Sequence, residues 1–266
     1  MLWYRRATWR FGWELASTVN VLALMLCTLL IMPEMTPIVD PPLRTLTGLN
    51  NAEDLFGHVF YLIGLTALLH TMLSRIDLRD HKAFVCARIE LPMLIGLPAL
   101  IGAFVAGEPD RVLDDFIAES SLQNDIWITV YWQIGCLMSI WILAHLVWAL
   151  LIIRRESASP TVANWYLAAI GVDTLCALGL SASALWPWFP AWPGWWLLCL
   201  ATMAYGAAAA VSWRAKLRHF GARNHRFTVA PQYRPPCGHR PVATARWWWL
   251  VLGGAREDGR VRRRAE

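Results

Sequence analysis

Long runs of apolar residues, separated by short polar segments, occupy the chain up to residue 212. Six of these runs are close to the roughly 20 residues that an α-helix needs to cross the hydrocarbon core of a bilayer. They cover residues 13–32, 55–73, 89–106, 126–153, 162–185 and 195–212. The pattern therefore predicts an all-α integral membrane bundle of six transmembrane helices, in a domain that covers residues 1–212.

Proline, glycine and other small residues modify this pattern. Residues 33–54 hold several prolines, which predicts an outer loop. The tryptophans and prolines of 186–196 predict a turn at headgroup level, with a re-entrant lid over a cavity as the alternative. In the third run, Pro92 and Pro98 predict a kinked helix with freed carbonyls. Small residues four apart predict close packing of the fifth helix against the sixth: Gly179 with Ser183, and Gly206 with Ala210.

The segment 107–125 is the most acidic part of the chain. Four apolar residues recur in it at helical spacing and indicate a short helix on the outer surface: Val112, Leu113, Phe116 and Ile117. A solvated acidic loop fits the same composition, and a vestibule that gathers cations is a third interpretation.

Basic residues set the predicted orientation of the bundle. The inner segments, counted with the start of the tail at 213–227, carry thirteen Lys or Arg residues, whereas the outer loops carry only Arg44 and Arg111. This asymmetry follows the positive-inside rule and places both the N- and the C-terminus in the cytoplasm. We therefore predict a multi-pass protein of the plasma or inner membrane, whose first partner is the lipid bilayer.

Residues 213–266 differ in composition from the rest of the chain. They carry thirteen Lys or Arg against three Asp or Glu, which accounts for the positive net charge of the chain. They are also rich in Pro and Gly and cannot bury a core, which predicts a disordered basic cytoplasmic tail. The apolar patch 247–252 within this tail is too short to cross a bilayer. The charge of the tail suits anionic lipid headgroups, whereas its composition offers no folded surface to read nucleic acid.

No catalytic or metal-binding motif occurs in the chain. It has no HExxH, GxSxG, P-loop or dinucleotide-binding pattern, and its six cysteines stand singly, without a CxxC pair. We therefore expect a protein that is not an enzyme and that holds no metal and no cofactor.

Asp173 is the exception within the apolar runs, because it falls near the middle of 162–185. An aspartate at the bilayer centre costs roughly 2.5–3.5 kcal/mol on insertion scales, so it needs a partner in the bundle interior. Such residues mark ion or proton paths, and they also serve as hydrogen-bond hubs between helices. His145, about 7 Å nearer to the cytoplasm by helical rise, is the predicted relay partner on such a path.

Residues 32–69 resemble a stretch that recurs in a loosely defined actinobacterial family of multi-pass membrane proteins. The similarity consists of a proline-rich loop, a Gly-x-Asn-x-Ala turn at Gly48, Asn50 and Ala52, and a helix with an early histidine, His58. Members of that family have no assigned role and are sometimes described as transporters, and phages of the same hosts carry related small membrane proteins. The resemblance implies a bacterial or phage membrane protein and no catalytic activity.

The sequence is compatible with three functions. The first is a non-enzymatic membrane module that acts through protein or lipid contacts, as in envelope regulation or phage exclusion, with a membrane protein or a second copy as partner. The second is a small proton- or cation-coupled transporter organised on Asp173. The third is a redox protein with a haem between His70 and His145, although helical rise places these two histidines roughly 6 Å apart in depth.

Overall fold

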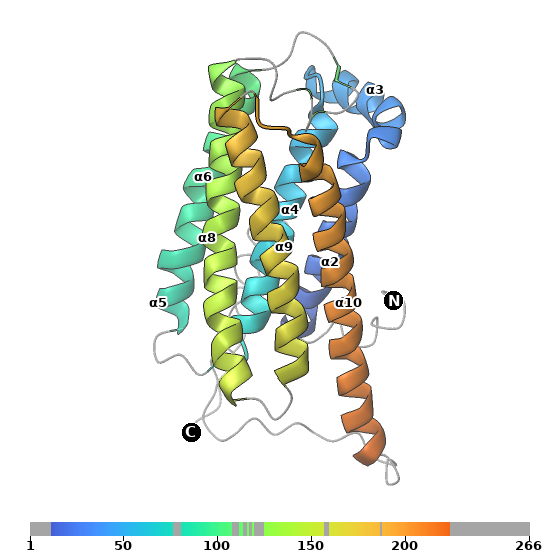
Figure 1. Cartoon of the computed structure of the whole chain (residues 1–266), viewed down its shortest axis with the longest axis vertical. Coiled ribbons are helices and arrows are strands. Elements are labelled where there is room, and N and C mark those ends of the chain that lie inside the picture. The colour runs from blue at the N-terminus through green and yellow to red at the C-terminus, as the bar shows by residue number, and fades with distance from the viewer. Residues whose placement is uncertain are drawn as a thin grey trace, which may run out of the picture. The chain divides into compact units, whose positions relative to one another are not determined.

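The computed structural model describes residues 12–76, 81–107, 112, 113, 116, 119, 125–156, 160–186 and 188–223. These residues are helical apart from short turns, and none of them lies in a strand. The long helices run alternately up and down one axis (Figure 1). They are α2 (Gly12–Ile31), α4 (Ala52–Leu73), α6 (Leu91–Ala106), α8 (Ile126–Glu156), α9 (Pro160–Leu185) and α10 (Trp192–Arg223).

Five of the described helical segments are long and apolar enough to cross a membrane: Ala52–Leu73, Ala83–Ala106, Ile126–Arg155, Pro160–Leu185 and Trp196–Ala215. A sixth span results if α2 is counted together with the helical segment Pro33–Thr47, which bends away from it by 71°. The predicted fold class, a helical bundle with membrane-spanning helices, is confirmed. Five of the predicted spans, those of α2, α4, α6, α8 and α9, begin and end within three residues of their expected positions.

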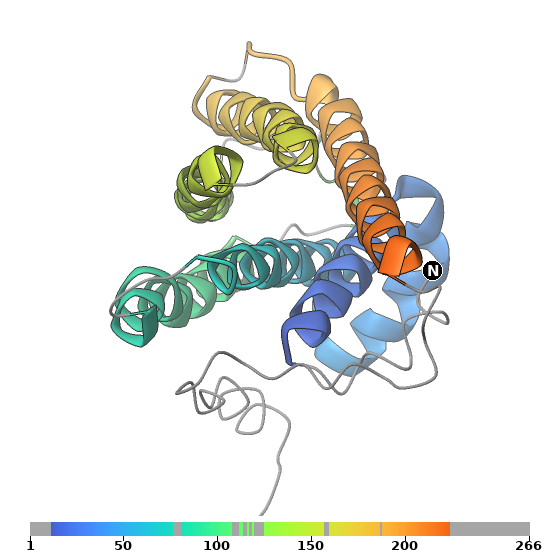
Figure 2. The same cartoon turned by 90° about the horizontal axis from the view of Figure 1, so that it is seen from below.

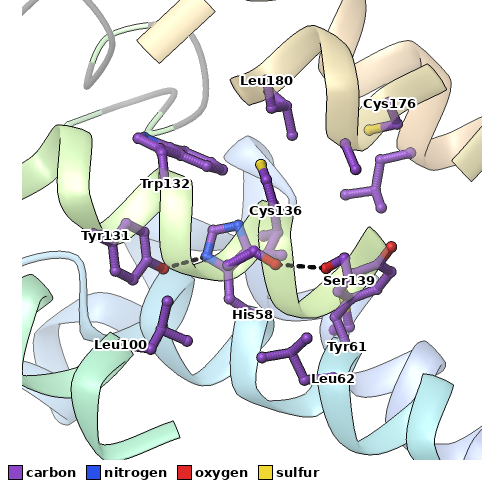
Figure 3. Close-up of a pocket in the computed structure, with 15 residues that line it drawn as sticks. His58, Tyr61, Leu62, Leu100, Tyr131, Trp132, Cys136, Ser139, Cys176 and Leu180 are labelled. Atoms are coloured by element: carbon purple, nitrogen blue, oxygen red, sulfur yellow. Dashed lines mark hydrogen bonds between the residues drawn. The ribbon is translucent and has the colours of Figure 1, made fainter. Parts of the chain in front are cut away.

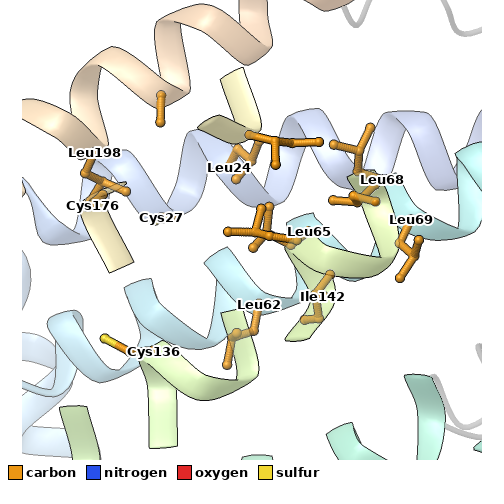
Figure 4. Packing of buried hydrophobic residues seen from close by; sticks show 14 of the residues in the cluster. Leu24, Cys27, Leu62, Leu65, Leu68, Leu69, Cys136, Ile142, Cys176 and Leu198 are labelled. Carbon is orange, nitrogen blue, oxygen red and sulfur yellow. The ribbon is translucent and has the colours of Figure 1, made fainter. Parts of the chain in front are cut away.

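The helices form two rows when the bundle is seen from below (Figure 2). One row contains α6, α4 and α2, and the other contains α8, α9 and α10. α4 packs closely against α2, and it also contacts α6 and α8. Its residues Leu65 and Leu69 are fully buried in the apolar core that these helices share (Figure 4). Helix α4 is therefore the central element of the core.

A glycine lies at the contact between α2 and α4. A Cβ atom at Gly64 would lie 3.1 Å from the side chain of Leu24, so a larger residue there would require that side chain to shift. The amide Nδ2 of Asn20 also donates a hydrogen bond to the carbonyl of Gly64 at 2.8 Å. Asn20 is the one amide side chain in its apolar run, and it is used to join two spans.

The third span contains a π-helical turn, η3 (Cys86–Glu90), between the short helix α5 (His81–Val85) and α6. Pro92 has no N–H to offer to the carbonyl of Arg88, four residues earlier. The indole Nε1–H of Trp141 on α8 donates to this carbonyl at 2.8 Å. The freed carbonyl that the sequence predicts is therefore confirmed at Arg88, and it serves as a contact between two spans.

The segment 33–54, predicted to be an outer loop, is helical for most of its length. A 3-10 turn, η2 (Pro33–Met35), leads into α3 (Thr36–Thr47), which has a proline in its first turn, where a missing N–H costs no hydrogen bond. Gly48 ends this helix in the left-handed region at φ 77°, and its N–H bonds to the carbonyl of Arg44 at 2.8 Å. Pro41 and Pro42 lie inside this helix and do not end it, and its polar residues Thr36 and Asp40 are buried.

Other expectations also change with the structure. The acidic segment 107–125 is not simply a solvated loop, because Leu113 and Phe116 within it are buried in the core. A Cβ atom at Gly179 or at Gly206 would meet nothing within 4 Å, so the predicted close packing through these small residues is wrong. Helix α10 continues to Arg223, past the expected end at residue 212, and the rest of the predicted tail lies outside the described residues.

Candidate functional site at Asp173

Asp173 lies on α9 and its exposed fraction is 0%. Both of its carboxylate oxygens accept hydrogen bonds from tyrosines on other helices. The hydroxyl of Tyr61 on α4 donates to Oδ1 at 2.5 Å, and the hydroxyl of Tyr205 on α10 donates to Oδ2 at 2.9 Å. One carboxylate therefore joins three spans.

Tyrosine suits this position for a physical reason. Its ring can pack among apolar side chains, while its hydroxyl needs a partner once it is buried. Tyr205 is 4% exposed, so its hydroxyl would lose a hydrogen bond to water with no replacement if Asp173 were apolar. In return, a carboxylate in an apolar bundle needs donors, and two phenols supply them without introducing a second charge. The carboxylate and the two hydroxyls therefore satisfy each other's need for hydrogen bonds.

His145 is not part of this site. Its Nδ1 bonds to the backbone carbonyl of Trp141, one turn earlier on α8, at 2.8 Å. Its ring packs against that of Trp141, with centroids 4.8 Å apart, and against Phe84 of α5 at 5.9 Å. The predicted relay pair, Asp173 and His145, is therefore not in contact. The ring of His145 is also not turned toward His70, as ligation of a haem between these two histidines would require.

A small cavity of about 50 Å³ lies between α2, α4, α6, α8, α9 and α10, and Tyr61, the partner of Asp173, is among its lining residues (Figure 3). Its polar lining groups are largely engaged with one another. The hydroxyl of Tyr131 pairs with Nδ1 of His58 at 2.5 Å, and that of Ser139 donates to the carbonyl of Gly135 at 2.8 Å. The other lining residues are mostly apolar, as Leu62, Leu100, Leu180 and Leu198 show.

Apolar cavities of this kind stay dry, because a buried water needs two to four polar partners. Tyr61 lines the cavity, yet its hydroxyl is bound to Asp173. The cavity therefore offers no continuous series of free polar groups that leads to the carboxylate.

A second polar cross-link joins α8 to α9. The side-chain Nε2 of Gln133 donates to the carbonyl of Ser181 at 2.9 Å, and the hydroxyl of Ser181 donates back to Oε1 of Gln133 at 2.8 Å. Together with Asn20, Tyr131, Trp141 and Asp173, this pair establishes a common pattern. These side chains join one helix to another, whereas others in the described spans, such as Ser139 and His145, bond to a carbonyl of their own helix.

Two of the three residues that make the site are not evident from the sequence. Tyr61 and Tyr205 lie in apolar runs with other aromatic residues, and nothing in their spacing marks them as partners of Asp173. A usable signal is their chemistry: each is a tyrosine inside a predicted span, away from the membrane interfaces where tyrosine usually lies. Both hydroxyls are therefore candidates to bond to Asp173 on the basis of their position within the spans.

No protein-family model, no curated protein and no solved structure matches this chain. Within the described residues, no group of three or more His, Cys, Asp or Glu side chains is placed to hold a metal ion. The protein class that the fold defines is an all-α bundle with five or six helices of membrane-spanning length.

Proposed function

We propose that this chain is a non-enzymatic module of the plasma or inner membrane, with both termini in the cytoplasm, and that it acts through contacts with protein or lipid. In this proposal Asp173 is a structural hub and does no chemistry. The observation that carries it is that a fully buried carboxylate receives one hydroxyl donor on each oxygen, from two different helices.

The bonding of Asp173 favours this role over transport. A residue that carries a proton or cation must be reached by it, and then released, from both sides of the membrane. Asp173 is instead held by α4 and α10 at once, and each such hydrogen bond in a bilayer contributes roughly 0.6–1.7 kcal/mol. Opening the site would require both bonds to break together.

The outward surfaces of the bundle support action through contacts. Leu94 and Ile95 on α6 are 57% and 64% exposed, and Met203 on α10 is 64% exposed. Lipid chains are the first partner for such side chains, and a membrane protein or a second copy of the chain is the further partner that we propose. In the interior, by contrast, Asp173, Gln133 and Asn20 form hydrogen bonds between helices.

Two substitutions at Asp173 test this proposal. An asparagine can accept from one tyrosine and donate to the other, so Asp173→Asn should leave the thermal stability of the purified protein nearly unchanged. Asp173→Leu removes both bonds and leaves two buried hydroxyls without partners, so it should lower the thermal stability clearly. Equal thermal stability of wild type and Asp173→Leu would show that the hydrogen bonds of Asp173 do not stabilise the bundle.

The alternative is a small proton- or cation-coupled transporter organised on Asp173. The observation that favours it is that Tyr61, which binds the carboxylate, also lines the cavity shared by six helices. On this alternative, Asp173→Asn would fold normally and abolish an ion flux that the wild type supports. The two functions therefore differ in what the asparagine variant loses.

A further inference from the structure

The connection from α3 to α4 buries several polar side chains at the end of the bundle where α4 begins (Figure 1). Each of them is less than a tenth exposed: Thr36, Asp40, Asn50, Asn51, Glu53 and Asp54. Two of these residues, Asp40 on α3 and Glu53 on α4, are carboxylic acids that face each other. This pair is remote in sequence from Asp173 and plays no part in the hub.

Asp40 is fixed by the turn between the two helices. Its Oδ1 accepts the N–H of Asn51 at 3.1 Å. Asn51 adopts a left-handed conformation at φ 55°, and its own side-chain oxygen accepts the N–H of Leu113 at 2.7 Å. This chain of bonds fixes Asp40 relative to α4 and to the segment that follows α6.

Glu53 is the unusual member of the pair. Its exposed fraction is 0%, and neither of its carboxylate oxygens has a hydrogen-bond partner among the described residues. The polar side chains of α3 that face it are Asp40, which is the charged group acting on it, and Thr36, which is neutral. Of the residues that the structure describes in the segment after α6, Leu113 reaches this turn, through its uncharged backbone N–H.

Two ionised carboxylates cannot be buried against each other without a positive charge or a proton between them, because both oxygens would be acceptors and their charges would repel. A cation would need several more oxygen ligands than two acids provide, and the described residues hold no cluster of three or more candidate ligands. A proton needs only the two facing oxygens. It turns one acid into a donor and the other into its acceptor.

We propose that Asp40 and Glu53 share one proton, and that this proton-binding site fastens α3 to the start of α4. When the proton leaves, the pair carries two negative charges and loses its hydrogen bond. The folded arrangement binds more protons than two independent carboxyls in an unfolded chain, so its stability falls as pH rises. The attachment of α3 is therefore controlled by the pH on its side of the membrane.

Hydrogen–deuterium exchange of the full chain in detergent micelles tests this site. The readout is the protection of the peptide that covers 36–47, with exchange times scaled for the intrinsic effect of pH. In the wild type, protection should fall by about tenfold per pH unit once the shared proton is lost. Peptides from α8 should keep their protection over the same range and show that the bundle remains folded.

Glu53→Gln supplies a permanent N–H in place of the shared proton, so protection of 36–47 should become independent of pH. Asp40→Asn places the N–H donor on the other partner, so protection of 36–47 should again be independent of pH. This second variant tests the proposal if Glu53→Gln does not fold. Glu34→Gln is the matched control, since it removes an exposed acid just before α3 and should behave as wild type.

Three results would overturn the proposal. The first is a wild-type protein whose α3 protection does not change with pH. The second is a Glu53→Gln protein that keeps the pH dependence. The third is recovery of protection at high pH when Ca²⁺ is added, because this would assign the site to a cation.

Discussion

Removal of the Tyr61 hydroxyl should destabilise the bundle, and it should do so only while Asp173 is present. Tyr61→Phe keeps the ring and deletes the donor that lies 2.5 Å from Oδ1 of Asp173. Hydrogen bonds between membrane helices contribute roughly 0.6–1.7 kcal/mol, and bonds to a charged acceptor lie at or above the upper end of that range. We therefore expect Tyr61→Phe to lower the free energy of unfolding by about 1–2 kcal/mol.

A double-mutant cycle isolates this bond. The free energy of unfolding would be measured by reversible SDS titration in mixed micelles for Tyr61→Phe, Asp173→Leu and the double variant. Residues that share a bond show coupling energies of about 0.5–3 kcal/mol, and we expect about 1–2 kcal/mol here. Tyr131→Phe is the matched control, since its hydroxyl pairs with His58, and it should add to Asp173→Leu within about 0.5 kcal/mol. Coupling at Tyr61 no larger than at Tyr131 would refute the hub.

Three further predictions follow from other parts of the chain. A Cβ atom at Gly107 would lie 2.8 Å from the backbone nitrogen of Ile128, so Gly107→Ala should destabilise the protein by about 1–3 kcal/mol in the same titration. Gly102→Ala, where a Cβ would meet nothing within 4 Å, should be tolerated, and equal losses would contradict this reasoning. Reporter fusions after Asp54, Leu122 and Pro190 should all report a location outside the cytoplasm. A cytoplasmic result at any of these positions would change the number of spans. A peptide of residues 213–266 should bind anionic vesicles at low salt and dissociate as salt rises, because each basic residue contributes about 1 kcal/mol. Equal binding to neutral vesicles would assign the anchoring to its tryptophans.

The long spans are predictable from the sequence because a bilayer constrains length and polarity directly. Residues that cross hydrocarbon must be apolar and helical over a fixed distance, so the limits of α4, α8 and α9 follow from local composition. The same rule gives no information outside the bilayer. Helix α3 is not predictable on this ground, because its prolines favour a loop, whereas the burial of Thr36 and Asp40 depends on contacts with α4.

The site was only half predictable. Asp173 is conspicuous because its charge contradicts its surroundings, and its need for partners follows from electrostatics alone. Which residues meet it depends on how the helices rotate and cross, and the sequence gives no separate signal for that. Depth along the membrane suggested His145, but the ring turns to the backbone of its own helix, and Tyr61 and Tyr205 reach the carboxylate instead.

A proton-flux measurement decides most directly whether Asp173 holds helices together or carries ions. Wild type and Asp173→Asn would be reconstituted at equal density into liposomes that contain a pH-sensitive dye, and a pH gradient would be imposed with valinomycin and K⁺ present. The proposed structural role predicts equal rates for both proteins, and both no faster than liposomes without protein. A wild-type rate that exceeds the Asp173→Asn rate, with both variants equally folded, would contradict it and assign Asp173 to a proton path.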